Sequence, residues 1–181
     1  MASGLIFNPL HLLHVAPLAT STATLAHALL ELHTNSAFLL PPIRQESNSV
    51  LPTWYDRVFN RAVWTVLTLN VGTIATSAAN LYLHRQAQSQ RPQLQTSAFY
   101  GVGLACAIGH LLFVPLVAGP VARVVERSRL NTVDSKSTSE STSEASGPTD
   151  HMATWLGVHR VRMLVADLPA WIAFAMAVAT L

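Results

Sequence analysis

The chain has 181 residues, of which 50% are hydrophobic and 11% are charged, whereas roughly a quarter of the residues in an average soluble protein are charged. The formal net charge of +2, with no basic patch interleaved with aromatic residues, argues against a nucleic-acid-binding protein. A single cysteine, Cys106, excludes an intramolecular disulfide. The composition therefore predicts an integral membrane protein.

Four apolar runs are each close to the ~20 residues that a helix needs to cross a bilayer. They extend from Leu10 to Leu30, from Ala62 to Leu83, from Ala98 to Val121 and from about Val161 to Leu181. Backbone polar groups must pair within the segment in lipid, so each run is expected to be a helix. The fold class that follows is all-α: a four-helix transmembrane bundle forming a single domain over residues 1–181.

The connections between the runs differ in character. Residues 31–61 are rich in proline and aromatic residues and fit an interfacial segment that leads into the second helix. Pro115 predicts a kink or an early end of the third helix, with the sequence FVPLVAGP as an irregular exit. Residues 84–97 are expected to form a short polar hairpin. Residues 131–150 are rich in Ser and Thr with almost no apolar side chains, which predicts a flexible, disordered loop between the third and fourth helices.

The distribution of basic residues predicts the topology. Of the 11 Lys and Arg residues, only Arg85 and Arg91 fall in the second connection, and the other nine fall in the first and third. The positive-inside rule therefore places the first and third connections in the cytosol and both termini on the other side. The first run has no basic segment before it, so we expect a retained helix rather than a signal peptide. In a eukaryote the expected location is the endoplasmic reticulum membrane.

Polar residues form a stripe along the second run. Asn70, Thr73, Ser77, Asn80 and His84 are spaced 3, 4, 3 and 4 residues apart, which places all five on one face of a helix. Asparagine in hydrocarbon is costly without a partner, so this face is expected to point into the bundle. The stripe serves either as packing between helices or as the wall of a polar cavity, with Asn70 and Asn80 as candidate substrate-binding residues.

Two further histidines fall within apolar runs. His27 lies four residues before Glu31 on one helical face, and His110 lies in the middle of the third run. An ionisable residue within a membrane span suggests a functional site, although each histidine could equally donate a single structural hydrogen bond. Ligand spacing typical of a metal site is absent within the spans, so no metal is predicted.

The start of the fourth run carries the densest set of polar residues. Trp155, His159 and Arg162 are spaced 4 and 3 residues apart and share a face, whereas Arg160 is offset from them. Both arginines could reach the cytosolic headgroups and set the orientation of the helix. Asp167 lies beyond the interface and needs a partner, so it indicates a polar pocket. Pro169 is expected to loosen the helix at this point.

The fourth run also carries a resemblance to a known family. The sequence WLGVHRVRMLVADLPAWIAF resembles the C-terminal signature of the anthrone oxygenase-like family, whose last helix opens with a Trp and then an Asn or His followed closely by Arg. The sequence Phe113-Val114-Pro115 resembles the proline-containing end of the family's third helix, and Pro41 and Pro42 match its early proline region. The order of four helices agrees over nearly the whole chain.

The resemblance implies an enzyme that oxidises a polyketide anthrone to a quinone with dioxygen as co-substrate and without a bound redox cofactor. Such chemistry needs a base, a cation that stabilises the oxyanion and a dry pocket. His159 or His27 is the expected base. Arg160 or Arg162 is expected to stabilise the enolate, with Asp167 as the further catalytic residue of this pocket. Trp155 is expected to stack on the substrate, with His110 as a further contact.

Two other interpretations remain open from the sequence. One is an isomerase, cyclase or dehydratase of secondary metabolism that uses the same acid–base residues without consuming oxygen. The other is a non-catalytic integral membrane protein in which the polar residues serve packing and topology. Phosphate-binding loops, dinucleotide fingerprints and the nucleophile elbow of serine hydrolases are absent, which argues against kinases, dehydrogenases and hydrolases. The expected partners are an apolar aromatic substrate and the lipid bilayer, and the sequence predicts no oligomeric state.

Overall fold

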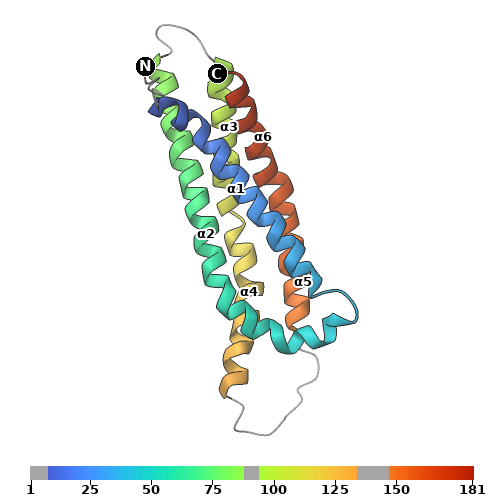
Figure 1. The fold of residues 1–181 in the computed structure, drawn as a ribbon. Helices are drawn as coiled ribbons and strands as arrows, with labels where there is room; N and C mark the ends of the chain where they lie inside the picture. Colours follow the sequence, from blue (N-terminus) through green and yellow to red (C-terminus); the bar gives the residue numbers. More distant parts are fainter. Residues whose placement is uncertain (1–7, 88–93, 134–146) are drawn as a thin grey trace, which may run out of the picture.

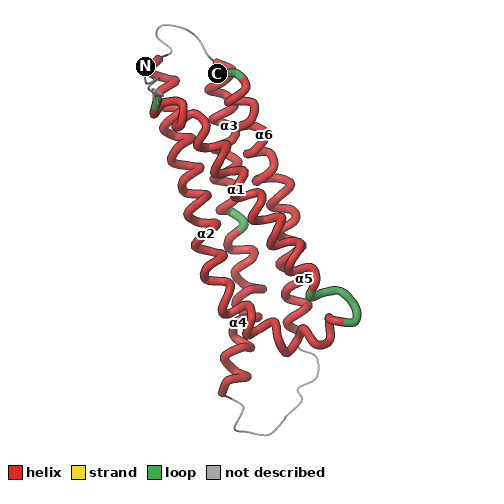
Figure 2. Tube along the Cα trace, in the orientation of Figure 1, coloured by secondary structure: helices red, strands yellow, loops and turns green. Residues whose placement is uncertain are grey.

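The computed structural model of the protein describes residues 8–87, 94–133 and 147–181, and every regular element in these ranges is a helix (Figures 1 and 2). Helix α1 spans Pro9–Ala37 and helix α2 spans Ile43–Ala87. Helices α3 (Leu94–Leu111) and α4 (Val114–Val133) follow one another along a third rod. Helix α5 (Pro148–Arg162), the π-helical turn η2 (Met163–Asp167) and helix α6 (Leu168–Ala179) form the fourth rod. The prediction of an all-α, four-helix architecture is confirmed.

The helices are longer than the apolar runs that predicted them. Helix α1 extends to Ala37 and helix α2 begins at Ile43, so the prediction that residues 31–61 form a connection between helices is wrong for residues 31–37 and 43–61. Tertiary packing explains the difference, because Leu51 and Tyr55 are buried against Val121 of α4 and Met152 of α5. Propensity and composition are weak predictors where such packing decides the local structure.

Pro115 interrupts the third rod, as its position predicted. The break lies at residues 112 and 113, directly after His110 and Leu111, because a proline nitrogen cannot donate to the carbonyl of the residue four positions earlier. The prediction of an irregular exit is wrong, since helix α4 starts at Val114 and continues to Val133. Of the two predicted polar connections, residues 88–93 and 134–146 lie outside the described residues. The described residues of both connections are helical apart from Gly147, which is the N-cap of α5.

Three helical stretches among the described residues are long and apolar enough to cross a membrane: 43–86, 95–126 and 148–179. Large apolar side chains are exposed along them, including Trp64 at 67%, Leu112 at 72% and Leu164 at 65%. In Figure 1 the start of α1 and the end of α6 lie at the same end of the bundle, as an even number of rods requires.

The interior consists of two apolar cores separated by a polar layer. One core lies around the α4–α5 pair and contains Leu51, Tyr55, Val121, Val124, Met152, Trp155 and Leu156. The other lies near the chain ends and contains Tyr100, Ala170, Phe174 and Ala177. Along the fourth rod, the buried polar residues His159, Arg162 and Asp167 fall between the two cores.

Helices α3 and α6 pack most closely where Gly103 faces Phe174. A Cβ atom on Gly103 would overlap the Phe174 ring, whose side chain is fully buried. Gly103→Ala should therefore lower the free energy of unfolding by about 1–3 kcal/mol, the usual cost of overpacking a core. Thermal unfolding in detergent, followed by far-UV circular dichroism, measures this.

Gly101→Ala is the matched control on the same helix, because no atom lies within 4 Å of its added Cβ. Alanine has the higher helix propensity, so this variant should unfold at or slightly above the wild-type temperature. Equal stability of the two variants would contradict the close packing of α3 on α6.

Candidate active site

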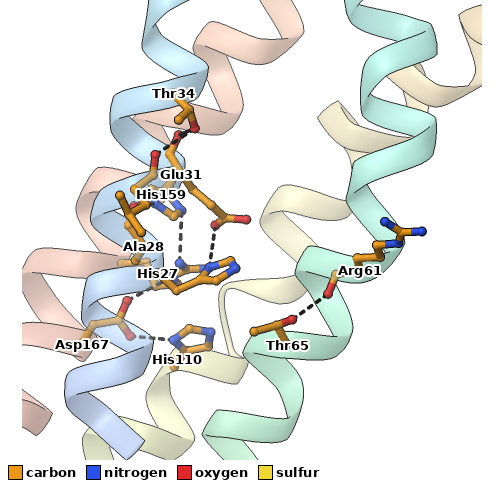
Figure 3. A network of polar contacts seen from close by, with 11 residues as sticks. His27, Ala28, Glu31, Thr34, Arg61, Thr65, His110, His159 and Asp167 are labelled. Carbon is orange, nitrogen blue, oxygen red and sulfur yellow. Dashed lines mark hydrogen bonds and ion pairs between the residues drawn. The ribbon is translucent and has the colours of Figure 1, made fainter.

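His110 and Asp167 form a buried hydrogen-bonded pair in the polar layer. The His110 Nδ1 atom lies 2.6 Å from Asp167 Oδ1, and the two side chains are 4% and 3% exposed (Figure 3). A carboxylate oxygen accepts, so Nδ1 carries the proton and Nε2 presents its lone pair when the ring is neutral. Among the described residues, no group hydrogen-bonds to Nε2. The pair therefore holds a histidine whose second nitrogen is available to take a proton.

His159 is held in one tautomer by its two neighbours. Its Nε2 atom lies 2.9 Å from the carbonyl oxygen of Ala28, which can only accept, so Nε2 donates. Its Nδ1 atom lies 3.1 Å from Arg162 Nη2, which can only donate, so Nδ1 accepts. His159 is fully buried and both ring nitrogens are engaged. It orients the Arg162 guanidinium rather than presenting a free lone pair.

The π-helical turn brings Arg162 and Asp167 to the same side of the fourth rod. Residues five apart in an α-helix point about 140° away from each other. The wider turn at Met163–Asp167 removes this offset, and Arg162 Nε lies 3.4 Å from Asp167 Oδ2. The Leu168 N–H bonds the Met163 carbonyl, and Pro169 has no N–H to hold the tighter α-helical turn.

A second histidine–carboxylate pair lies on α1. The Nδ1 atom of His27 lies 3.7 Å from Glu31 Oε2, and the side chains are 24% and 20% exposed. In Figure 3 both point from α1 toward the stretch of α2 that carries Arg61 and Thr65. His27 Nδ1 is buried without a hydrogen bond. Glu31, which could have been only a helix boundary, instead belongs to the edge of the polar layer.

A small cavity adjoins the buried Asp167. Its volume is ≈ 10 Å³, and Asn70, Thr73 and Asp167 contribute polar atoms to its lining. Asn70 donates to the Ala107 carbonyl at 3.2 Å, while Asn70 Oδ1 and Asp167 Oδ2 have no hydrogen-bond partner in residues 8–87, 94–133 and 147–181. The space suits one water molecule that donates to both oxygens. An aromatic substrate is far too large for it.

All five residues of the predicted stripe on α2 are buried, which confirms that the stripe faces the bundle interior: Asn70, Thr73, Ser77, Asn80 and His84. Both interpretations of the stripe apply, to different parts of it. Asn70 and Thr73 line the cavity, whereas Asn80 lies about 15 Å further along the helix. There Asn80 Oδ1 accepts from His14 Nδ1 at 2.6 Å, and Asn80 Nδ2 donates to the Leu13 carbonyl. Asn80 therefore joins α2 to α1 and lies apart from His110.

Of the remaining predicted site residues, some are buried in the bundle and one is exposed on its surface. Trp155 and Arg162 are buried on one face with His159, as their spacing predicted. The Trp155 ring lies 5.0 Å from the His159 ring and packs within the apolar core. Arg160 is exposed on another face, so the structure does not bring it to the site. The interpretation that Arg162 reaches the headgroups is wrong, because its side chain is held inside the bundle.

Sequence comparison supports the family suggested by the last helix. The chain is 29% identical over 177 residues to the epoxidase pydX of an Acremonium species, covering 96% of both chains. It is 30% identical over 175 residues to the epoxidase gkaX of Penicillium citrinum, covering 93% of both. No family model and no solved structure matches the chain. The chain belongs to the anthrone oxygenase-like family, which includes these fungal epoxidases.

Loss of the Asp167 charge should destabilise the protein strongly. In Asp167→Asn the buried Arg162 loses its carboxylate partner, and an uncompensated buried charge typically costs about 3–5 kcal/mol. Unfolding in detergent should show this loss. Asp150→Asn removes the exposed Arg44–Asp150 ion pair, in which Asp150 is 52% exposed, and serves as the control.

The control variant should lose no more than about 1 kcal/mol, because exposed ion pairs contribute little. Equal losses in the two variants would mean that Asp167 does not compensate a buried charge.

Proposed function

We propose that the protein is a membrane-embedded oxidative enzyme of secondary metabolism that removes a proton from an apolar, anthrone-type substrate and lets the resulting carbanion react with dioxygen. The observation that carries this proposal is the buried His110–Asp167 pair, in which His110 Nε2 has no hydrogen-bond partner among the described residues. A base of this kind acts on an acidic C–H or O–H group, which favours an enolisable substrate. The three long apolar helices support a site within a membrane.

His110 is the base in this mechanism. It accepts the substrate proton at Nε2, and Asp167 stabilises the imidazolium and fixes the ring through Nδ1. The sequence favoured His159 or His27 as the base. We prefer His110 to His159 because both nitrogens of His159 are engaged, and to His27 because no hydrogen bond from Glu31, 3.7 Å away, fixes the His27 ring. Arg162 lies beside Asp167 and contributes positive charge where the enolate oxygen forms.

The oxygen step balances without an external reductant for an anthrone-type methylene. The carbanion adds dioxygen to give a hydroperoxide at that carbon. Loss of water then converts the carbon to a carbonyl: one atom of dioxygen stays in the quinone, and the other leaves in water with both methylene hydrogens. Dioxygen is the co-substrate, and the substrate supplies all the electrons.

The names of the relatives favour a second outcome of the same intermediate. Both relatives described above are named epoxidases. A hydroperoxide next to a carbon–carbon double bond can pass its distal oxygen to that bond. The products are an epoxide and a hydroxyl group, and both oxygen atoms remain in the molecule. Proton removal at His110 is common to both outcomes.

Oxygen uptake by the purified full chain in detergent, with anthrone as the probe substrate, tests the proposal. Wild-type protein should consume dioxygen above the enzyme-free rate, and His110→Gln should reduce kcat by about 10²–10⁴-fold, the usual contribution of a general base. His33→Gln, at an exposed position on α1, is the control and should retain wild-type activity.

Isotope-labelled dioxygen identifies the outcome. Quinone formation adds one labelled oxygen with loss of two hydrogens, whereas epoxidation with hydroxylation retains two labelled oxygens. Product formation at full rate without oxygen would instead assign an isomerase, cyclase or dehydratase. Wild-type activity in His110→Gln would overturn the assignment of the base.

A further inference from the structure

The inward face of α2 is less buried at the level of the site than on either side of it. Tyr55, Phe59, Ala62, Val66 and Asn70 are spaced 4, 3, 4 and 4 residues apart, so they follow one face of the helix. Tyr55 and Asn70 are buried, but the three residues between them are only half-buried. Over these turns the described part of the chain covers the face less completely than it does at Tyr55 and Asn70.

The third rod shows the same gap at the same level. His110 and Val121 are buried, yet no residue from Leu111 to Pro120 is. Within this interval Phe113 and Val117 are half-buried, and Val117 packs on the edge of the apolar core that contains Val121. The break between α3 and α4 lies in this interval, so the helix is interrupted where its inner face is only half-buried.

The half-buried side chains of both rods are apolar, and the interval on the third rod begins directly after His110. Phe59 packs on the apolar core next to Tyr55, with ring centroids 5.3 Å apart. His110 closes the other end of the interval on the third rod. On α1, His27 and Glu31 point toward α2 across this region (Figure 3). The cavity beside Asp167, at ≈ 10 Å³, cannot hold a ring system.

We propose that an apolar, ring-containing substrate binds on this face, entering sideways from the membrane, with its acidic carbon toward His110. The face, here named the lateral face, is formed by Phe59, Ala62, Val66, Phe113 and Val117. This inference rests on the proposed function, which requires an apolar substrate at His110. The substrate completes a core that the protein leaves open between its two closed ends, and the burial of apolar surface provides the affinity.

Position 66 is where a larger side chain would fill the lateral face. Val66 lies one turn from Asn70 and has a short side chain, as does Ala62 one turn earlier. A tryptophan at position 66 would occupy the face without altering His110 or Asp167. Val71 lies on the opposite side of α2 and is 53% exposed, so Val71→Trp is a control of identical chemistry.

Photolabelling of the full chain in detergent or lipid nanodiscs tests the lateral face. The probe is an anthraquinone that carries a diazirine, which resembles the product in shape and needs no turnover. Mass spectrometry should place the label in residues 59–66 and 113–117. Val66→Trp should reduce labelling about tenfold, which corresponds to the loss of about 1.4 kcal/mol of binding free energy. Val71→Trp should leave the labelling unchanged.

Other occupants of the lateral face give other results, and each would overturn the proposal. If lipid covers the face, the label will spread over outward positions such as Trp64 and Val66→Trp will not reduce it. If a second copy of the chain covers it, cross-linked dimers will form and the probe will not compete with them. Labelling on the face without oxygen uptake would retain the binding site and reject the proposed reaction. Oxygen uptake unaffected by Val66→Trp would retain the proposed reaction and reject the lateral face as its binding site.

Discussion

The buried charge of Arg162 is the constraint on which the rest of the site depends. A guanidinium between two apolar cores is tolerated only with hydrogen-bonding and charged partners around it. His159 accepts from it and donates to the backbone of α1, while Asp167 lies beside it and bonds His110 on α3. One cation thereby fixes the relative positions of α1, α3 and the fourth rod, and the same contacts orient the proposed base.

The two apolar cores strengthen the electrostatic interactions within the polar layer. They close the bundle on either side of the polar layer, so the charges interact in a poorly hydrated interior where electrostatic effects are stronger than in water. In such surroundings a developing negative charge gains more from a fixed cation than it would in solution. In this poorly hydrated interior, His27 or Asp167 without a polar partner would lower the stability of the fold. Each histidine of the layer accordingly lies near a carboxylate or a carbonyl group.

Sequence periodicity predicted much of the helical architecture and only part of the site. The stripe from Asn70 to His84 and the face shared by Trp155, His159 and Arg162 follow from spacing along one helix, and the structure confirms both. The pairing of His110 with Asp167 joins residues 57 positions apart, which no local pattern encodes. The sequence did not predict the π-helical turn for a related reason. Pro169 indicated a loosened helix, but the form of the loosening depends on the packing of Arg162 against Asp167. Helix α2 was predicted too short because its first turns contain proline and polar residues and are held by tertiary contacts.

The π-helical turn also restricts how the fourth rod can vary among related chains. A π turn accommodates one more residue than an α-helical turn, so it behaves as an insertion whose strain the helix absorbs locally. If residues 163–167 adopted α-helical geometry without losing a residue, α6 would rotate by about 100° relative to α5. Phe174 would then leave its position against Gly103, or Arg162 would leave the interior. The number of residues between Arg162 and Phe174 is therefore coupled to the π-helical turn: a related chain without the turn needs one residue fewer to keep both side chains in the interior.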